Sequence, residues 1–75
     1  MNLRAMHSGE RGRIVGLLPG EKSYRQKLVA MGLIPGTEFS IARVAPLGDP
    51  VEIVVRGYAL SLRRDEAQIL QIEKV

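Results

Sequence analysis

Residues 28–63, LVAMGLIPGTEFSIARVAPLGDPVEIVVRGYALSLR, contain the signals that decide the fold of this chain. The stretch opens with the end of a helix, because Gly32 can adopt the left-handed conformation that closes one. The Pro-Gly pair that follows cannot extend the helix and turns the chain. Three short strand-like runs come next, separated by the loop at residues 46–50 and by the single Gly57. This order of helix end, turn and strands predicts a small, curled antiparallel sheet.

The remaining sequence adds two strands and further helical structure. A helix is expected over residues 24–31, with Ser23 at capping-box spacing from Gln26. A single helical turn with Asp65 at its N-cap is expected near the C-terminus. Strands are expected at residues 13–18, after a glycine-marked loop at 8–12, and at residues 37–44, 51–56, 58–62 and 69–73. The sequence therefore predicts a mostly β protein with one or two short helices, an SH3-like small β-barrel, as a single domain over residues 1–75.

Apolar periodicity indicates which side chains face the core. Alternation in the second strand points Phe39 and Ile41 inward, but the pattern slips at Arg43. Either a bulge changes the phase of the strand there, or Arg43 lies at the rim with its stem buried. Gly16 marks another bulge or bend. The other predicted core positions are Leu3, Met6, Tyr24, Leu28, Met31, Val51, Ile53, Val55, Tyr58, Leu60, Leu62, Leu70 and Ile72.

Composition limits the classes of function. The 75 residues include no cysteine, which excludes disulfides and thiolate metal ligands. No apolar run approaches the ~20 residues that span a bilayer, and residues 1–8 contain no apolar signal segment. We therefore expect a cytoplasmic protein without membrane insertion. The net charge of +3 is compatible with an acidic partner, a phosphate or a membrane surface, and equally with none of them.

Candidate catalytic and ligand-binding groups are sparse. His7 is the single histidine, so no nucleophile–histidine couple can be assembled, and no cluster of soft metal ligands is present. A helix cap explains Asp65, and a turn explains Asp49. We therefore expect no enzyme, no catalytic residue, no cofactor and no dedicated metal site. Nucleic acid is not an expected partner, because the three aromatic side chains are assigned to the core rather than to a stacking surface.

Three segments are informative together: RQKLVAMGLIPGT at residues 25–37, APLGDP at 45–50 and GYALSLR at 57–63. In this order and spacing they resemble the ferrous iron transport protein A family (FeoA). The resemblance implies an SH3-like fold and a cytoplasmic accessory role in bacterial ferrous iron uptake. The implied partner is the membrane permease, ferrous iron transport protein B, whose cytosolic GTPase or whose gating the protein would regulate.

The same resemblance leaves an alternative. Similar domains form the C-terminal domain of iron-dependent transcriptional repressors, so the chain could instead be a metal-responsive or nucleic-acid-binding module. Transition-metal binding, which the family also implies, would be weak here or at an intermolecular contact, because this chain has no ligand cluster.

Docking on a partner would use side chains on the helix and on the proline-rich loop. Apolar residues that folding leaves exposed, flanked by arginines, are the expected contact points. The candidate partner-binding residues are Arg25, Leu33, Arg43, Pro46, Leu47, Asp49, Val54 and Arg56. In the alternative interpretation, Leu33 and Leu47 instead cap the ends of the barrel.

Overall fold

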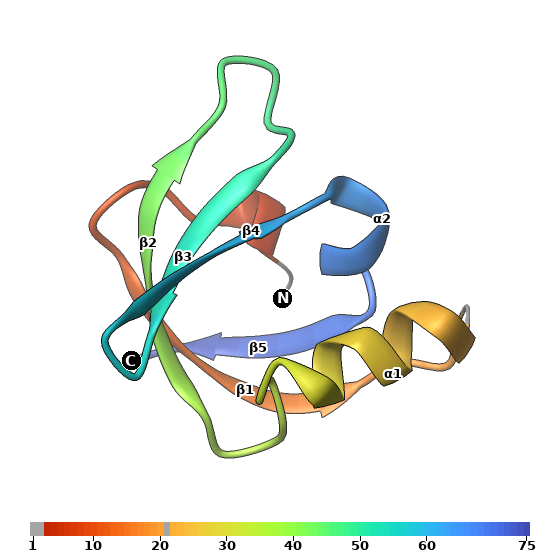
Figure 1. Cartoon of the computed structure of the whole chain (residues 1–75). Coiled ribbons are helices and arrows are strands. Elements are labelled where there is room, and N and C mark those ends of the chain that lie inside the picture. The colour runs from red at the N-terminus through yellow and green to blue at the C-terminus, as the bar shows by residue number, and fades with distance from the viewer. Residues whose placement is uncertain (1–2, 21) are drawn as a thin grey trace.

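The computed structural model describes residues 3–20 and 22–75, which form one curled antiparallel sheet with short helices at its open side (Figure 1). The strands are β1 (Arg11–Leu17), β2 (Glu38–Val44), β3 (Val51–Val55), β4 (Tyr58–Leu62) and β5 (Leu70–Lys74). The helices are α1 (Lys22–Ala30), α2 (Arg64–Ala67) and the 3₁₀ helix η1 (Leu3–Ala5). The prediction of a mostly β protein with short helices is confirmed. The predicted domain over residues 1–75 includes Met1, Asn2 and Glu21, which lie outside the described residues.

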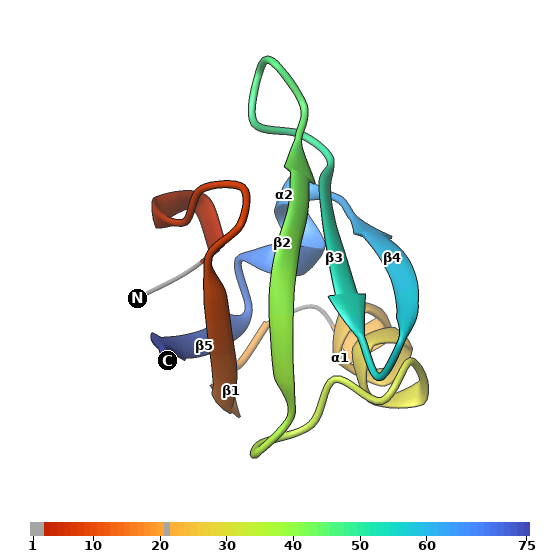
Figure 2. The same ribbon diagram turned by 90° about the vertical axis from the view of Figure 1, so that its left-hand side faces the viewer.

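The sheet curls around its core but does not close. Its strand order is β4-β3-β2-β1-β5, each neighbouring pair is antiparallel, and within the described part of the chain no ladder joins β4 to β5. The expected barrel is therefore open between these two strands (Figure 2). The helices α1 and α2 cover the core at this opening, where Leu28 and Ala67 are buried. Helix packing thus shields the side of the core that a β4–β5 ladder would otherwise close.

Two bulges bend the sheet. The register between β1 and β5 shifts between Ile14 and Gly16, which confirms the bulge or bend predicted at Gly16. The register between β2 and β3 shifts between Ile41 and Arg43. The bulge is therefore the correct explanation for Arg43, whose side chain is exposed.

The core lies inside the curl, and the predicted core positions are confirmed with one exception. Tyr58 was expected to face inward, but it is 43% exposed. Its strand is at the edge of the sheet, and its hydroxyl donates a hydrogen bond to the carbonyl oxygen of Met31 at 2.9 Å. A tyrosine hydroxyl needs such a polar partner, and here the partner lies at the end of α1 rather than inside the core.

The strand boundaries differ from the predictions by at most two residues, and those of β4 are as predicted. The largest shift is at β1, which begins at Arg11, where a loop was expected. Gly12 lies in the middle of the sheet, because it is in register with Phe39 on one side and with Lys74 on the other. Glycine at this position therefore belongs to a strand, although the residue type indicated a loop.

Both α-helices begin one residue or more before the predicted start. Helix α1 begins at Lys22, which places Ser23 in its first turn instead of before it. Helix α2 has Arg63 as its N-cap, so that Asp65 lies inside the first turn and is not the cap. The carboxylate of Glu66 accepts a hydrogen bond from the backbone N–H of Arg63 at 3.0 Å. This bond satisfies a backbone donor at the start of α2 that the helix itself cannot satisfy.

The chain leaves α1 through a Schellman motif. Gly32 has φ of 84°, its N–H donates to the Val29 carbonyl at 2.9 Å, and the N–H of Leu33 donates to the Leu28 carbonyl at 3.0 Å. These two bonds are those of the motif, which is commonly accompanied by an apolar contact between the residues at the Leu28 and Leu33 positions. Both leucines are 0% exposed. The helix therefore ends at the glycine that the sequence indicated, and the chain enters the core directly after it.

Replacing Gly32 by Ala is expected to lower the free energy of unfolding by about 1–2 kcal/mol, because a Cβ disfavours the left-handed conformation by that amount. The new Cβ would also lie 2.7 Å from the present position of Arg56 Nη1, so this side chain would have to shift. The matched control is Gly32→Asn, which tolerates positive φ better and should lose less stability. Urea denaturation measures both, and equal losses for the two variants would contradict the explanation.

Candidate docking surface

The loop between β2 and β3 projects from the sheet and is held by its own backbone (Figures 1 and 2). The N–H of Gly48 donates to the Ala45 carbonyl at 2.7 Å, and the N–H of Ala45 donates to the Pro50 carbonyl at 3.1 Å. Gly48 has φ of 81°, which a glycine adopts without strain. The loop is therefore an ordered projection, as its two prolines predicted.

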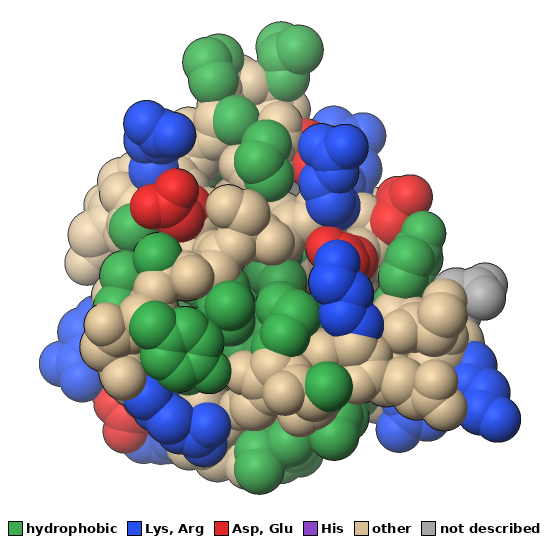
Figure 3. All heavy atoms as spheres, in the orientation of Figure 1, with side chains coloured by type: hydrophobic (Ala, Val, Ile, Leu, Met, Phe, Trp, Pro, Cys, Tyr) green, Lys and Arg blue, Asp and Glu red, His purple; other side chains and the backbone are tan. Residues whose placement is uncertain are grey.

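Leu47 is the most exposed large apolar side chain of the described residues, at 88%. Pro46 beside it is also exposed, and Figure 3 shows apolar side chains at the top of the molecule, where this loop lies. Burying a leucine side chain is worth about 1.5–3 kcal/mol. Since the loop backbone is already fixed, little ordering entropy would be lost when a partner covers it. Leu47 is therefore suited to fill an apolar pocket on another protein.

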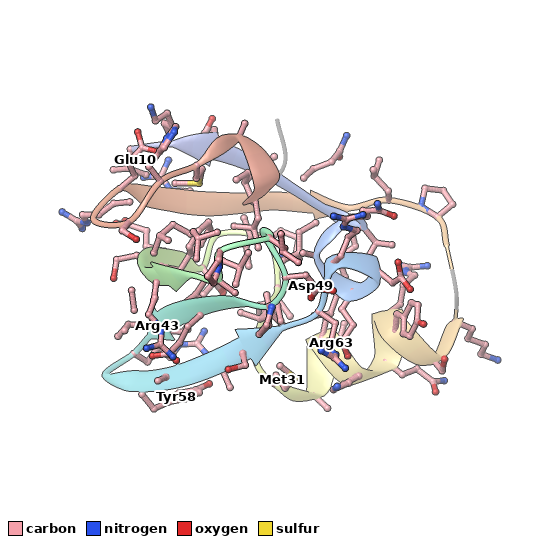
Figure 4. All side chains as sticks on the ribbon, turned by 90° about the horizontal axis from the view of Figure 1, so that it is seen from above. Glu10, Met31, Arg43, Asp49, Tyr58 and Arg63 are labelled. Carbon is pink, nitrogen blue, oxygen red and sulfur yellow. The ribbon has the colours of Figure 1, made fainter. Side chains whose placement is uncertain are left out.

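Asp49 anchors this loop to the rest of the fold. Its carboxylate accepts a hydrogen bond from the backbone N–H of Arg64, the first residue of α2, at 3.0 Å. In Figure 4, Asp49 and the neighbouring Arg63 lie on the side of the molecule where the loop approaches α2. Asp49 was predicted as a docking residue, and the structure gives it a positioning role for the loop as well.

The other predicted docking residues are spread over the molecule. Arg43 is exposed on β2 near the base of the loop, and Val54 is half-buried on β3, where it lines a shallow hollow of about 180 Å³. Arg56 lies at the turn between β3 and β4, beside Gly32. Arg25 lies on α1. The structure therefore does not bring the predicted residues into one continuous surface.

The expectation that folding leaves Leu33 exposed to a partner is wrong. Leu33 is 0% exposed, because the Schellman motif carries it from the end of α1 into the core. The alternative interpretation, in which Leu33 caps one end of the core, is the correct one for this residue. It does not hold for Leu47, which stays in solvent.

Glu10 is an ionised side chain with a structural role, in the loop directly before β1 (Figure 4). Its carboxylate is hydrogen-bonded to the Lys74 ammonium and accepts the N–H of His7 at 2.6 Å. The hydrogen bond from Lys74, followed by that from the His7 backbone, lowers the pKa of Glu10 from 4.5 to about 2. Glu10 therefore holds the N-terminal loop to β5 and stays charged at neutral pH.

Glu66 is a buried carboxylate between the two α-helices. Its side chain is 5% exposed, forms an ion pair with Lys27 of α1, and accepts the backbone N–H of Arg63. Burial alone would raise the pKa of Glu66, but the hydrogen bonds from Lys27 and Arg63 and their charges outweigh burial and hold the pKa below 4.5. This ion pair joins α1 to α2 at the open side of the sheet.

The described residues offer surface rather than an enclosed polar site. Among them, no three His, Cys, Asp or Glu side chains lie close enough together to hold a metal ion. Nor is any helix in this part of the chain long and apolar enough to cross a membrane. What the geometry presents to other molecules is the rigid loop with Leu47 and the outward face of α1.

The outward face of α1 carries a hollow that the sequence analysis did not find. It has a volume of about 470 Å³ and is lined by Gly20, Lys22, Arg25, Gln26, Val29 and Ala30. Arg25 was the single predicted docking residue among these. A signal was present in the sequence, because Val29 is out of phase with the buried stripe of α1 and follows Lys22 and Arg25 at helical spacing.

Five short antiparallel strands curled around one core, with a helix inserted between the first two strands, define an SH3-like domain. A crystal structure described as FeoA from Stenotrophomonas maltophilia complexed with zinc, a procaryotic SH3 domain protein, has this fold. It shares 18% identity over 97% of this chain and 89% of its own, with a TM-score of 0.83. At that identity the likeness concerns the fold alone.

The chain belongs to the FeoA domain family, whose sequence model matches residues 1–74. The NMR structure of an FeoA-like protein from Clostridium acetobutylicum is 36% identical, with a TM-score of 0.88 over 100% of this chain and 86% of that one. The Fe(2+) transport protein A/Fe(2+) transporter FeoB fusion protein of Porphyromonas gingivalis is 32% identical over the whole chain. The chain spans 9% of the length of that relative. The predicted family is confirmed, and the family is linked to ferrous iron transport.

Proposed function

We propose that this protein is a cytoplasmic accessory module of bacterial ferrous iron uptake that docks on the permease, ferrous iron transport protein B, and regulates its GTPase or its gating. The observation that supports this most directly is the Porphyromonas gingivalis relative, whose name places transport protein A and transporter FeoB in one chain. A covalent link keeps two domains at a high effective concentration, which is useful where they act together. Where the two are separate chains, a docking surface must replace the link, and the protein is then peripheral at the inner membrane through this contact.

The contact surface proposed is the loop at residues 45–50. Leu47 is exposed at its tip, the backbone is fixed, and Asp49 ties the loop to α2. Arg43 near the base of the loop adds a positive charge at the rim of the contact. An apolar anchor in the centre with charges around it is the usual arrangement of a protein–protein contact.

Replacing Leu47 by Asp is expected to weaken binding to the purified cytosolic domain of the permease by at least about tenfold, which corresponds to about 1.4 kcal/mol. The loss follows because an aspartate in an apolar pocket is desolvated without a partner. Isothermal titration calorimetry at low salt measures the affinity. The control is Val75→Asp, since Val75 is also an exposed apolar side chain, at 58%. Absence of binding by the unmodified protein, or equal binding by Leu47→Asp, would refute the proposal.

The alternative function, a metal-responsive or nucleic-acid-binding module, makes a different prediction. It requires discrete NMR shifts when the protein is titrated with ferrous iron or with DNA at micromolar concentration. The docking proposal requires such shifts with the permease domain and none with the other two ligands. The same labelled sample therefore distinguishes the two functions.

A further inference from the structure

Charge is distributed unevenly over the described side chains. On β1, β2 and β5, and in the loop before β1, cations and carboxylates lie together: Arg11 and Arg13 pair with Glu38, Arg13 also with Glu73, and Lys74 with Glu10. The charges of these three cations and three carboxylates therefore cancel, whereas Arg43, also on β2, is not part of these pairs. The other described charges are seven cations, Lys22, Arg25, Lys27, Arg43, Arg56, Arg63 and Arg64, and four carboxylates, Asp49, Glu52, Asp65 and Glu66. The positive excess of the protein lies on this second group, to which α1 belongs.

Helix α1 contributes three of these cations and no carboxylate between Lys22 and Ala30. Lys27 is neutralised by Glu66. Among the described side chains, no carboxylate lies within ion-pairing distance of Lys22 or Arg25, and both are exposed. These two cations are therefore available to a negatively charged group from outside the chain.

The same two cations border the hollow on α1. The hollow lies between the helix and Gly20 in the connection from β1, and Val29 and Ala30 supply its apolar lining. Val29 is 48% exposed. The volume of the hollow, about 470 Å³, is enough for a large aliphatic or aromatic side chain. A hollow with an apolar lining and cations at its edge is complementary to a ligand that carries an apolar side chain next to carboxylates.

We infer that the outward face of α1 binds an acidic segment of a partner protein, with one apolar side chain in the hollow and carboxylates on Lys22 and Arg25. The concave shape favours a protruding side chain over the flat surface of a membrane. In Figure 1, α1 lies at the opposite end of the molecule from the loop at residues 45–50, so both surfaces can be occupied at once. The inference does not require the partner to be the permease.

The test uses the full chain, labelled with ¹⁵N, and a short synthetic peptide in which leucines alternate with glutamates. We expect amide shifts concentrated at Gly20, Lys22, Arg25 and Val29, and binding that weakens as salt is added. Arg25→Glu should weaken this binding at least about tenfold. Arg43→Glu is the matched control, since it reverses an exposed arginine outside the hollow and should change affinity less than about threefold.

Three results would overturn the inference: no shifts at the hollow, equal binding of a peptide with lysines in place of the glutamates, or equal binding by Arg25→Glu. A fourth arm uses vesicles that contain phosphatidylglycerol. If vesicles shift the same amides and the acidic peptide does not, the surface binds a membrane and the inference is wrong. Leu47→Asp should bind the peptide like the unmodified protein, so that failure of this inference and failure of the docking proposal are distinguishable.

Discussion

Replacing Leu33 by Ala is expected to lower the free energy of unfolding by about 3–5 kcal/mol, the range measured for leucines buried in well-packed cores. Leu33 is 0% exposed, and the hydrogen bond that its N–H donates to the Leu28 carbonyl fixes its backbone at the end of α1. The site therefore cannot collapse easily around a smaller side chain, and a cavity remains. Urea denaturation followed by circular dichroism measures the loss.

The control is Leu47→Ala, which makes the same chemical change in a side chain that is 88% exposed. Its stability should stay within about 0.5 kcal/mol of the unmodified protein. The effects of the two variants on binding to the permease domain should be the reverse of their effects on stability. Leu47→Ala should weaken binding to the permease domain, whereas Leu33→Ala should bind normally under conditions in which it is folded. A loss below about 1 kcal/mol for Leu33→Ala would mean that this leucine is not packed as described.

The elements of the fold could be predicted because their signals are local. Alternation identified Phe39 and Ile41 as inward positions, and Gly32 identified the end of α1, since each signal depends on a few neighbouring residues. The signal for the burial of Leu33 was also local. An apolar residue directly after a helix-closing glycine makes the apolar contact of a Schellman motif with the residue five positions earlier, here Leu28.

The open side of the sheet could not be predicted in this way. Whether β4 pairs with β5 depends on how the chain crosses from one to the other through α2, and on how α1 packs over the gap. The same holds for Tyr58, whose partner, the Met31 carbonyl, lies far away in sequence. No pattern within β4 distinguishes a tyrosine in the core from one at an edge strand.

The two candidate surfaces differ in the same way, because one depends on local sequence and the other on contacts between separate segments. The exposure of Leu47 was one of two interpretations that the sequence left open, and the structure decides for it. The hollow on α1 exists only because the connection at Gly20 lies beside the outward face of the helix. Sequence reasoning therefore found Arg25 as a charge but not the apolar cavity that it borders. Docking at either surface stays a prediction.

Replacing Lys27 by Met is expected to lower the free energy of unfolding at neutral pH by about 2 kcal/mol. The substitution keeps the apolar stem and removes the cation, which leaves the Glu66 carboxylate buried with the Arg63 N–H as its remaining described partner. Breaking a fully buried ion pair costs about 3–5 kcal/mol. The Lys27 side chain is 55% exposed, so water can reach part of the vacated space and reduces the loss. The control is Arg13→Met, which breaks exposed pairs with Glu73 and Glu38 and should lose less than about 1 kcal/mol.

The loss caused by Lys27→Met should depend on pH in a defined direction. In the unmodified protein the pKa of Glu66 lies below 4.5, so its contribution to stability is present above that pH and is lost as pH falls through the folded-state value. Without Lys27, burial acts against fewer opposing groups and raises the folded-state pKa of Glu66, so that protonation costs this variant less. The difference in unfolding free energy between the two proteins should therefore be largest near neutral pH and should shrink as pH falls through the raised pKa of Glu66 in the variant towards the lower pKa in the unmodified protein. Urea denaturation across this range measures it, and a difference that stays constant or grows in acid would show that Lys27 does not stabilise the Glu66 carboxylate.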